Sequence, residues 1–178
     1  MKWKDKLIND IENYLKDDKD WSTVFSDAIN VKGNNIHLAV FNEPFLTMIF
    51  IGIKTVESRF SLNKVAPFGK IARGDIVLMK ENGGPVVGFF VIDWFLHYTN
   101  INADKLTKIE RLFRGKIGWV ENENFLKMKE TSKFLTLIGI GNIKRIDGLE
   151  TTKKDRLAWT VLKMGFRNTL FDTKGLYE

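Results

Sequence analysis

The first thirty residues place apolar and charged positions with the periodicity of two helices. Apolar side chains recur every three or four residues in each stretch, which puts them on one helix face. The first stripe contains Trp3, Leu7, Ile8, Ile11 and Leu15, and the second contains Trp21, Val24, Phe25, Ala28 and Ile29. Asp20 or Ser22 is the expected N-cap of the second helix, because its side-chain oxygen would accept a backbone hydrogen bond. Both stripes are predicted to pack on the rest of the chain.

From residue 36 the pattern changes to short apolar runs that are typical of strands. Strands are expected at 36–41, 55–60, 74–79, 86–95 and 134–143. Three helices are expected. The first begins after Asn42, which would cap it, and ends at Gly52. The second covers 102–113 and ends at Gly115, and the third lies around 122–130. The turn at residues 82–85 is a hairpin signal. Strands interrupted by single helices predict an α+β fold with a small curled sheet or barrel.

These elements divide the chain into two parts. Residues 1–35 are interpreted as a helical extension that packs on the main domain, and residues 36–178 as the main domain. Residues 31–35 (Val-Lys-Gly-Asn-Asn) form the expected linker. A length of 178 residues fits one domain with a small addition.

The composition excludes several kinds of chemistry. With no Cys and two His, the chain cannot form a disulfide, a cysteine nucleophile, an iron-sulfur cluster or a three-His zinc site. We expect no metal and no cofactor, so catalysis would depend mainly on carboxylates, Lys, Arg and hydroxyls. The start of the chain lacks the apolar stretch of a secretory signal, and the longest apolar run, 45–53, is too short to cross a membrane. A cytoplasmic protein is therefore expected.

Positive charge is concentrated near the end of the chain. The sequence has 28 Lys and Arg against 22 Asp and Glu, and residues 127–178 hold eleven basic and six acidic side chains. Such an excess favours a polyanionic partner, most simply RNA. Lys153, Lys154 and Arg156 could follow an RNA backbone, with Trp159 as a stacking platform. An ordinary solvated basic edge is the equally weighted alternative, and the secondary structure of this tail is left open.

The segment from Gly52 to Arg59 carries the strongest candidate chemistry. A helix end delivers Lys54 to the start of a strand, on which alternation places Thr55, Glu57 and Arg59 on one face. Glu57 and Arg59 would lie about 7 Å apart along the strand. A carboxylate flanked by two cations can accept hydrogen bonds from a nucleobase, while the cations can meet phosphate or a base carbonyl. The alternative is an ion-pair strip on a solvated strand.

This segment resembles the Gly-x-Lys-x-x-Glu-x-Arg signature of the ASCH family (activating signal cointegrator homology). The resemblance extends to Pro44-Phe45, Gly74-Asp75 and residues 84–88, and covers about residues 36–145. It implies a PUA-like β-barrel with a cleft between the short helix and the barrel. The cleft would be lined by Lys54, Glu57 and Arg59, and would take single-stranded RNA or a modified pyrimidine nucleoside.

The resemblance also implies two kinds of enzyme as alternatives. Some similar proteins hydrolyse N4-acetylcytidine with a Lys and a Thr in this segment, but Glu57 occupies the position of that Thr here. Thr55 is therefore a weak nucleophile candidate, with Lys54 as its base, or Glu57 could activate water. In a single-strand ribonuclease, Lys54 and Arg59 would stabilise phosphorane charge and Glu57 would move protons. The leading hypothesis is an RNA- or nucleotide-binding domain with a positively charged cleft, followed by a hydrolase and then a protein-interaction module.

Other conspicuous residues are interpreted as structural. His37 and His97 are lone histidines near apolar strands, and neither is expected to be catalytic. The aromatic cluster of Trp94, Phe95 and Tyr98 is expected in the core more than in base stacking. Residues 139–142 (Gly-Ile-Gly-Asn) lack the Lys of a phosphate loop, so close packing explains these glycines better.

Overall fold

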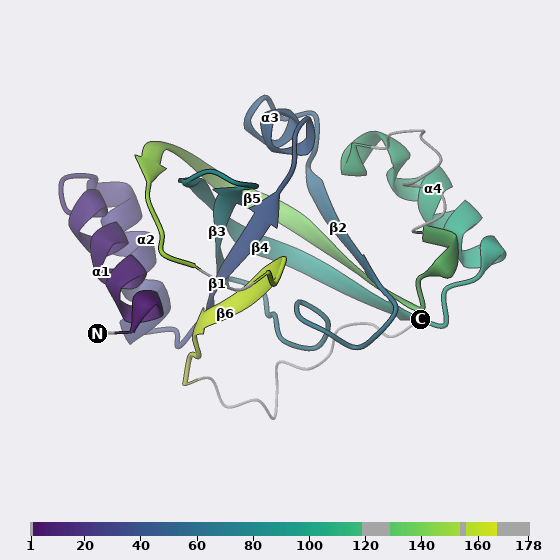
Figure 1. Cartoon of the computed structure of the whole chain (residues 1–178), viewed down its shortest axis with the longest axis horizontal. Helices are drawn as coiled ribbons and strands as arrows, with labels where there is room; N and C mark the ends of the chain where they lie inside the picture. Colours follow the sequence, from purple (N-terminus) through teal and green to yellow (C-terminus); the bar gives the residue numbers. More distant parts are fainter. Residues whose placement is uncertain (1, 119–128, 154–155, 167–178) are drawn as a thin grey trace.

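The computed structural model describes residues 2–118, 129–153 and 156–166, which form one curled six-stranded sheet with helices at its two ends (Figure 1). The strand order is β2-β5-β4-β3-β1-β6, and β1 pairs in parallel with β3 while the other neighbours pair antiparallel. The predicted α+β class with a small curled sheet is confirmed. The elements are α1 (Trp3–Leu15), α2 (Lys19–Asn30), β1 (Ile36–Phe41), α3 (Phe45–Phe50), β2 (Val56–Ser61), β3 (Ile76–Glu81), β4 (Val86–Thr99), α4 (Ala103–Ile117), β5 (Phe134–Leu149) and β6 (Trp159–Lys163).

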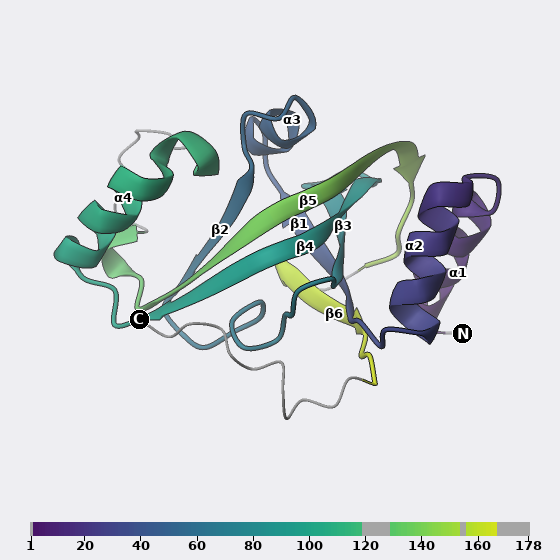
Figure 2. The same ribbon diagram turned by 180° about the vertical axis from the view of Figure 1, so that it is seen from behind.

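Helices α1 and α2 lie side by side at the end of the sheet opposite α4, as both views show (Figures 1 and 2). Their apolar stripes are buried, and Leu7, Ile11 and Phe25 share one core with Leu38 and Phe89 of the sheet. The predicted cap of α2 was wrong. Asp18, not Asp20 or Ser22, accepts the hydrogen bond of the Trp21 N–H group, because the helix begins at Lys19, before the first apolar residue of its stripe.

The helix α3 follows β1 as predicted, but its N-terminus is built differently. Asn42 does not cap it with its side chain. Instead, the Glu43 carboxylate accepts hydrogen bonds from the backbone N–H and the hydroxyl of Thr47. The helix ends before Gly52, which has a φ of 77° and turns the chain into the segment that carries Lys54.

The helix α4 begins as expected, because the Asn102 side chain accepts the Lys105 N–H group. It does not stop at Gly115. It continues to Ile117 and ends at Gly118, which adopts the left-handed conformation with a φ of 64°. The two extra residues bring the carbonyl oxygen of Ile117 to the candidate site. Of the helix expected at 122–130, only residues 129 and 130 belong to the described chain, and both are helical.

The long strands β4 and β5 are neighbours within the sheet, and each extends beyond its predicted length (Figure 2). They approach closely at Gly139, where a Cβ atom would lie 2.2 Å from Nε1 of Trp94. Close packing is therefore the reason for this glycine, as predicted. Trp94, Phe95 and Tyr98 pack against hydrophobic core clusters. No helix in the described ranges is both long and apolar enough for a membrane span.

Candidate functional site

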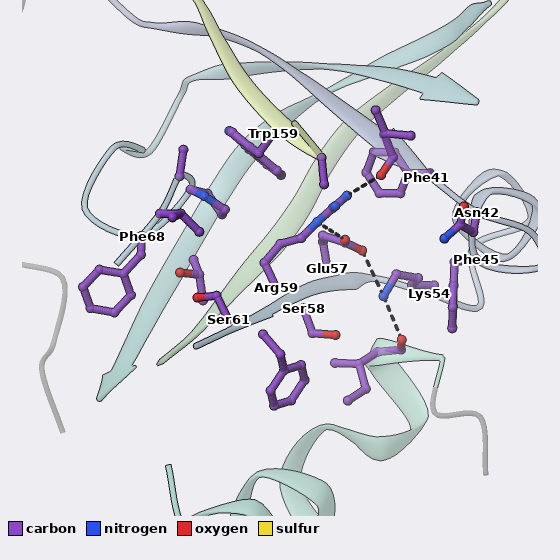
Figure 3. Close-up of a pocket in the computed structure, with 18 residues that line it drawn as sticks. Phe41, Asn42, Phe45, Lys54, Glu57, Ser58, Arg59, Ser61, Phe68 and Trp159 are labelled. Carbon is purple, nitrogen blue, oxygen red and sulfur yellow. Dashed lines mark hydrogen bonds and ion pairs between the residues drawn. The ribbon is translucent and has the colours of Figure 1, made fainter. Parts of the chain in front are cut away.

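Lys54, Glu57 and Arg59 come together at the junction of α3 and β2 (Figure 3). The Nζ atom of Lys54 lies 3.1 Å from one carboxylate oxygen of Glu57, Oε2. The Nε atom of Arg59 lies 2.6 Å from the other oxygen, Oε1. The spacing therefore predicted correctly which three ionic groups gather, and each oxygen of the carboxylate is held by a different cation.

Lys54 is 2% exposed, and its contacts hold two elements of the fold together. Its ammonium group donates to the carbonyl oxygens of Val56 at 2.9 Å and Ile117 at 2.7 Å, in addition to its ion pair with Glu57. An ammonium group has three protons, so all three have acceptors. Burial lowers the pKa of Lys54, and the negative charge of Glu57 opposes this effect. Lys54 thus ties the start of β2 to the end of α4.

Glu57 is the central acceptor of the site. Burial alone would raise its pKa, but the charges of Lys54 and Arg59 outweigh burial and hold the pKa of Glu57 below its ordinary value. The carboxylate is therefore ionised at neutral pH. Two ionised oxygens offer about four acceptor positions, and the two cations use one on each oxygen. The remaining capacity is available at the pocket that Glu57 lines.

The guanidinium group of Arg59 lies between two aromatic rings. Its central carbon is 4.9 Å from the centre of the Phe41 ring and 5.3 Å from that of the Trp159 ring. One Nη atom donates to the carbonyl oxygen of Val40 at 2.9 Å. These contacts fix the guanidinium beside the carboxylate.

Trp159 belongs to the wall of this pocket. β6 pairs with β1 and leaves the side chain 4% exposed, so Trp159 lies at the pocket wall and not along an open basic edge. Its indole N–H donates to Nδ1 of His37 at 3.2 Å, and Nε2 of His37 lies 3.0 Å from Oδ2 of Asp75. This buried chain of hydrogen bonds holds the indole in place, which gives His37 the structural role expected for it.

The three ionic residues line a pocket of about 410 Å³, a volume in the range of small-molecule sites. Its walls include five aromatic side chains, and four uncharged polar side chains also line it. The aromatic residues are Phe41, Phe45, Phe60, Phe68 and Trp159, and the polar ones are Asn42, Ser58, Ser61 and Thr136. In Figure 3, Phe68 and Ser61 lie on one side of the pocket and Phe45 and Lys54 on another. Within the described ranges, no group of three or more acidic or histidine side chains could hold a metal ion.

Several sequence candidates lie outside the pocket. Thr55 is exposed and does not line it; β2 begins at Val56, one residue after Thr55. Lys153 is half-buried and lines no part of the pocket. Arg156 is exposed, two residues before Ala158 at the pocket wall. Lys154 falls outside the described residues.

Phe68 and Thr136 were not predicted as site residues, and neither was the position of His97 behind the pocket. His97 is 3% exposed, and Nε2 accepts the Gly69 N–H group at 3.3 Å. Its Nδ1 lies 3.0 Å from Oγ1 of Thr136. Burial lowers the pKa of His97 to about 4. Strand register pairs His97 with Thr136, and the turn at 66–70 brings Phe68 and Gly69 to them.

Comparison with known proteins now identifies the architecture. No family model matches the chain, and no curated protein sequence matches it. A crystal structure of the ASCH protein from Zymomonas mobilis, in a serine-to-alanine mutant, superimposes with a TM-score of 0.56 at 13% identity and covers 74% of this chain and 90% of its own. The chain has the ASCH fold. Another structure of the same bacterial ASCH protein gives a TM-score of 0.49 at 15% identity over 65% of this chain and 73% of that one.

The ASCH fold places the ionic triad in a definite setting. The junction of α3 and β2 faces the end of α4 on one side and β6 on the other, and β1, β5 and the loop at 65–68 complete the wall of the pocket. The predicted cleft beside the short helix therefore has a physical counterpart. The alternative of a solvated ion-pair strip was wrong, because Lys54 and Glu57 are 2% and 5% exposed.

Proposed function

We propose that this chain is an RNA- or nucleotide-binding member of the ASCH family, and that its pocket holds one pyrimidine base of a single-stranded RNA or of a nucleoside or nucleotide. The observation that carries the proposal is the ionised Glu57 carboxylate, which retains acceptor capacity at an aromatic-walled pocket. The proposal rests on matching chemistry, since a pyrimidine base is planar and offers N–H donors at its edge.

The aromatic walls suit a flat ligand. Stacking of a base on an aromatic side chain contributes about 1–3 kcal/mol, and Phe68 and Phe45 lie on different walls of the pocket. A phosphate would be repelled by Glu57, whereas a base amino or imino group would donate to it. The base would therefore enter the pocket, and the phosphates would stay outside, where Arg156 is exposed near the wall formed by Ala158.

The geometry supports binding more than catalysis. For Lys54 to act as a base, its ammonium group would have to give up one of three engaged protons. Glu57 with a lowered pKa is a weak general base at neutral pH. Thr55 does not line the pocket. A hydrolase is therefore the second candidate and a protein-interaction module the third.

The experiment is a titration of the protein with labelled single-stranded oligouridine and oligocytidine, and with uridine, cytidine and N4-acetylcytidine, over a series of salt concentrations. We expect binding of RNA that weakens as salt rises. Glu57→Gln should lose about 10- to 100-fold in affinity, as expected for a lost charge-assisted hydrogen bond. Glu12→Gln on the exposed face of α1 is the matched control and should bind like the wild type.

Three results would overturn the proposal. Absence of binding by the wild type at low salt, to RNA and nucleosides alike, would leave the interaction module. Equal affinities of Glu57→Gln and the wild type would show that the carboxylate of Glu57 does not contribute to ligand binding. Release of acetate from N4-acetylcytidine, or shortening of the RNA, would establish the hydrolase in place of the binding domain.

A further inference from the structure

Three polar side chains form a row across three neighbouring strands under the pocket. Arg59 on β2 lies opposite Thr136 on β5, and Thr136 lies opposite His97 on β4. Residues directly opposite each other on neighbouring strands project from the same face of a sheet. Arg59 and Thr136 line the pocket, and His97 extends the row beneath Phe68, whose ring centre is 4.6 Å from the imidazole.

The hydrogen bonds of His97 determine where its proton lies. The Gly69 N–H group can only donate, so the Nε2 atom that receives it carries a lone pair. Because burial holds the pKa of His97 at about 4, the ring is neutral at pH 7. A neutral imidazole with a bare Nε2 carries its proton on Nδ1. The Nδ1–H group therefore donates to Oγ1 of Thr136, 3.0 Å away.

The direction of this hydrogen bond leaves the hydroxyl proton of Thr136 for another acceptor. Thr136 is 1% exposed and lines the pocket. In the part of the chain that the structure describes, His97 is the hydrogen-bond partner of this hydroxyl. We infer that Thr136 is a specificity-determining residue that donates its hydroxyl proton to an acceptor atom of the bound base, and that His97 is the positioning residue that sets this direction. The inference rests on the function proposed above.

Together, Glu57 and Thr136 would read a donor and an acceptor on one ligand. Glu57 lies opposite Ile138, two residues along β5 from Thr136, so the two side chains are diagonal neighbours about 7–8 Å apart at the backbone. Glu57 offers an acceptor, and Thr136 offers a donor. Uracil presents N3–H between two carbonyl oxygens, and cytosine presents its amino group beside N3 and the O2 carbonyl. A base of this kind could satisfy both side chains at once.

The test compares oxygen and sulfur at the acceptor position. Binding of uridine, 2-thiouridine, 4-thiouridine, cytidine and 2-thiocytidine is measured for the wild type and for Thr136→Val, which removes the hydroxyl but keeps the shape. Sulfur accepts hydrogen bonds weakly, so the wild type should prefer oxygen at one carbonyl position by about three- to tenfold. Thr136→Val should lose this preference, and Thr136→Ser should retain it. A purely structural role would weaken all ligands equally.

A second measurement examines the wild type alone. The nitrogen chemical shifts of the His97 imidazole report which ring atom is protonated, and we expect protonated Nδ1 and bare Nε2 at pH 7. A proton on Nε2, or an unchanged oxygen preference in Thr136→Val, would overturn the inference while the proposed function stands. Failure of the wild type to bind RNA or any of the nucleosides would overturn both.

Discussion

Replacing Lys54 with Met should strongly destabilise the protein. The substitution keeps a side chain of similar length but removes the ammonium group that contacts Glu57, Val56 and Ile117. Removing one partner of a buried ion pair lowers the free energy of unfolding by about 3–5 kcal/mol. The two carbonyl groups also lose a donor, although water in the adjoining pocket would replace part of that interaction. We expect a loss of about 4 kcal/mol in the free energy of unfolding.

The assay is equilibrium unfolding in urea, followed by tryptophan fluorescence, with thermal melting as a second measurement. For a chain of this size, 1 kcal/mol corresponds to about 2–4 °C in Tm, so the expected decrease is roughly 8–16 °C. Lys6→Met is the matched control. Its ion pair with Asp10 spans 2.8 Å on the surface of α1, and exposed pairs of this kind contribute about 0.3–0.5 kcal/mol.

A double substitution separates the ion pair from the other contacts of Lys54. In Lys54→Met combined with Glu57→Gln, no carboxylate remains to be compensated, so part of the lost stability should return. A free energy of unfolding within 1 kcal/mol of the wild type for Lys54→Met alone would refute the reasoning. So would a double variant that is less stable than the sum of the single losses.

The ion pair between Lys54 and Glu57 also predicts how the stability of the protein changes as the pH falls. The folded-state pKa of Glu57 lies below its ordinary value of 4.5, so its contribution to stability is present above that value and is lost as the pH falls through the folded-state pKa. With Lys54 replaced, one of the two cations is gone and the pKa of Glu57 rises. Acid unfolding of Lys54→Met should therefore begin at a higher pH than that of the wild type.

Three further predictions concern His97, Gly139 in β5 and Gly115 in α4. Burial lowers the pKa of His97 from 6.5 to about 4, so the unfolded chain binds a proton at a higher pH than the folded chain, and the free energy of unfolding should fall by about 1–2 kcal/mol between pH 6.5 and 5. In His97→Gln the urea midpoint should lack this decrease. An equal pH dependence of the urea midpoint in the wild type and in His97→Gln would contradict the prediction. Gly139→Ala should destabilise by about 1–3 kcal/mol because its Cβ would meet Trp94 at 2.2 Å. Gly115→Ala, with open space inside α4, should stabilise by about 0.5–1 kcal/mol in the same melts, and the opposite order would refute the packing argument.

Local sequence patterns predicted the parts of the site that are close in the chain. Lys54, Glu57 and Arg59 lie within six residues, so a helix end followed by a strand was enough to bring them together. Thr55 was misplaced because alternation was applied one residue before the strand begins. The exact start of a strand depends on which partner carbonyls are in register, and that information is not local.

The remaining parts depend on distant segments. Thr136 reaches the pocket because β5 pairs with β2 in one register, and a shift by one residue would turn it to the other face of the sheet. The Ile117 carbonyl meets Lys54 only because α4 continues past Gly115. A glycine inside a helix costs about 1 kcal/mol relative to Ala, which the surrounding contacts override. Neither the register of β5 nor the length of α4 can be deduced from the periodicity of the sequence.

The pairing of Glu57 with two cations is what makes it useful as a ligand-binding group. An isolated carboxylate at 5% exposure would protonate and become partly a donor. Here Lys54 and Arg59 keep it ionised, and each contacts a separate oxygen, so acceptor positions remain on both. The cations are themselves held by backbone carbonyls and aromatic rings. The acceptor is therefore oriented before a ligand arrives, so that little conformational entropy is lost on binding. The ion pairs and the pocket are thus both needed. Without the pocket, the ion pairs would only stabilise the fold. Without the ion pairs, Glu57 would be protonated and the pocket would present a neutral carboxylic acid.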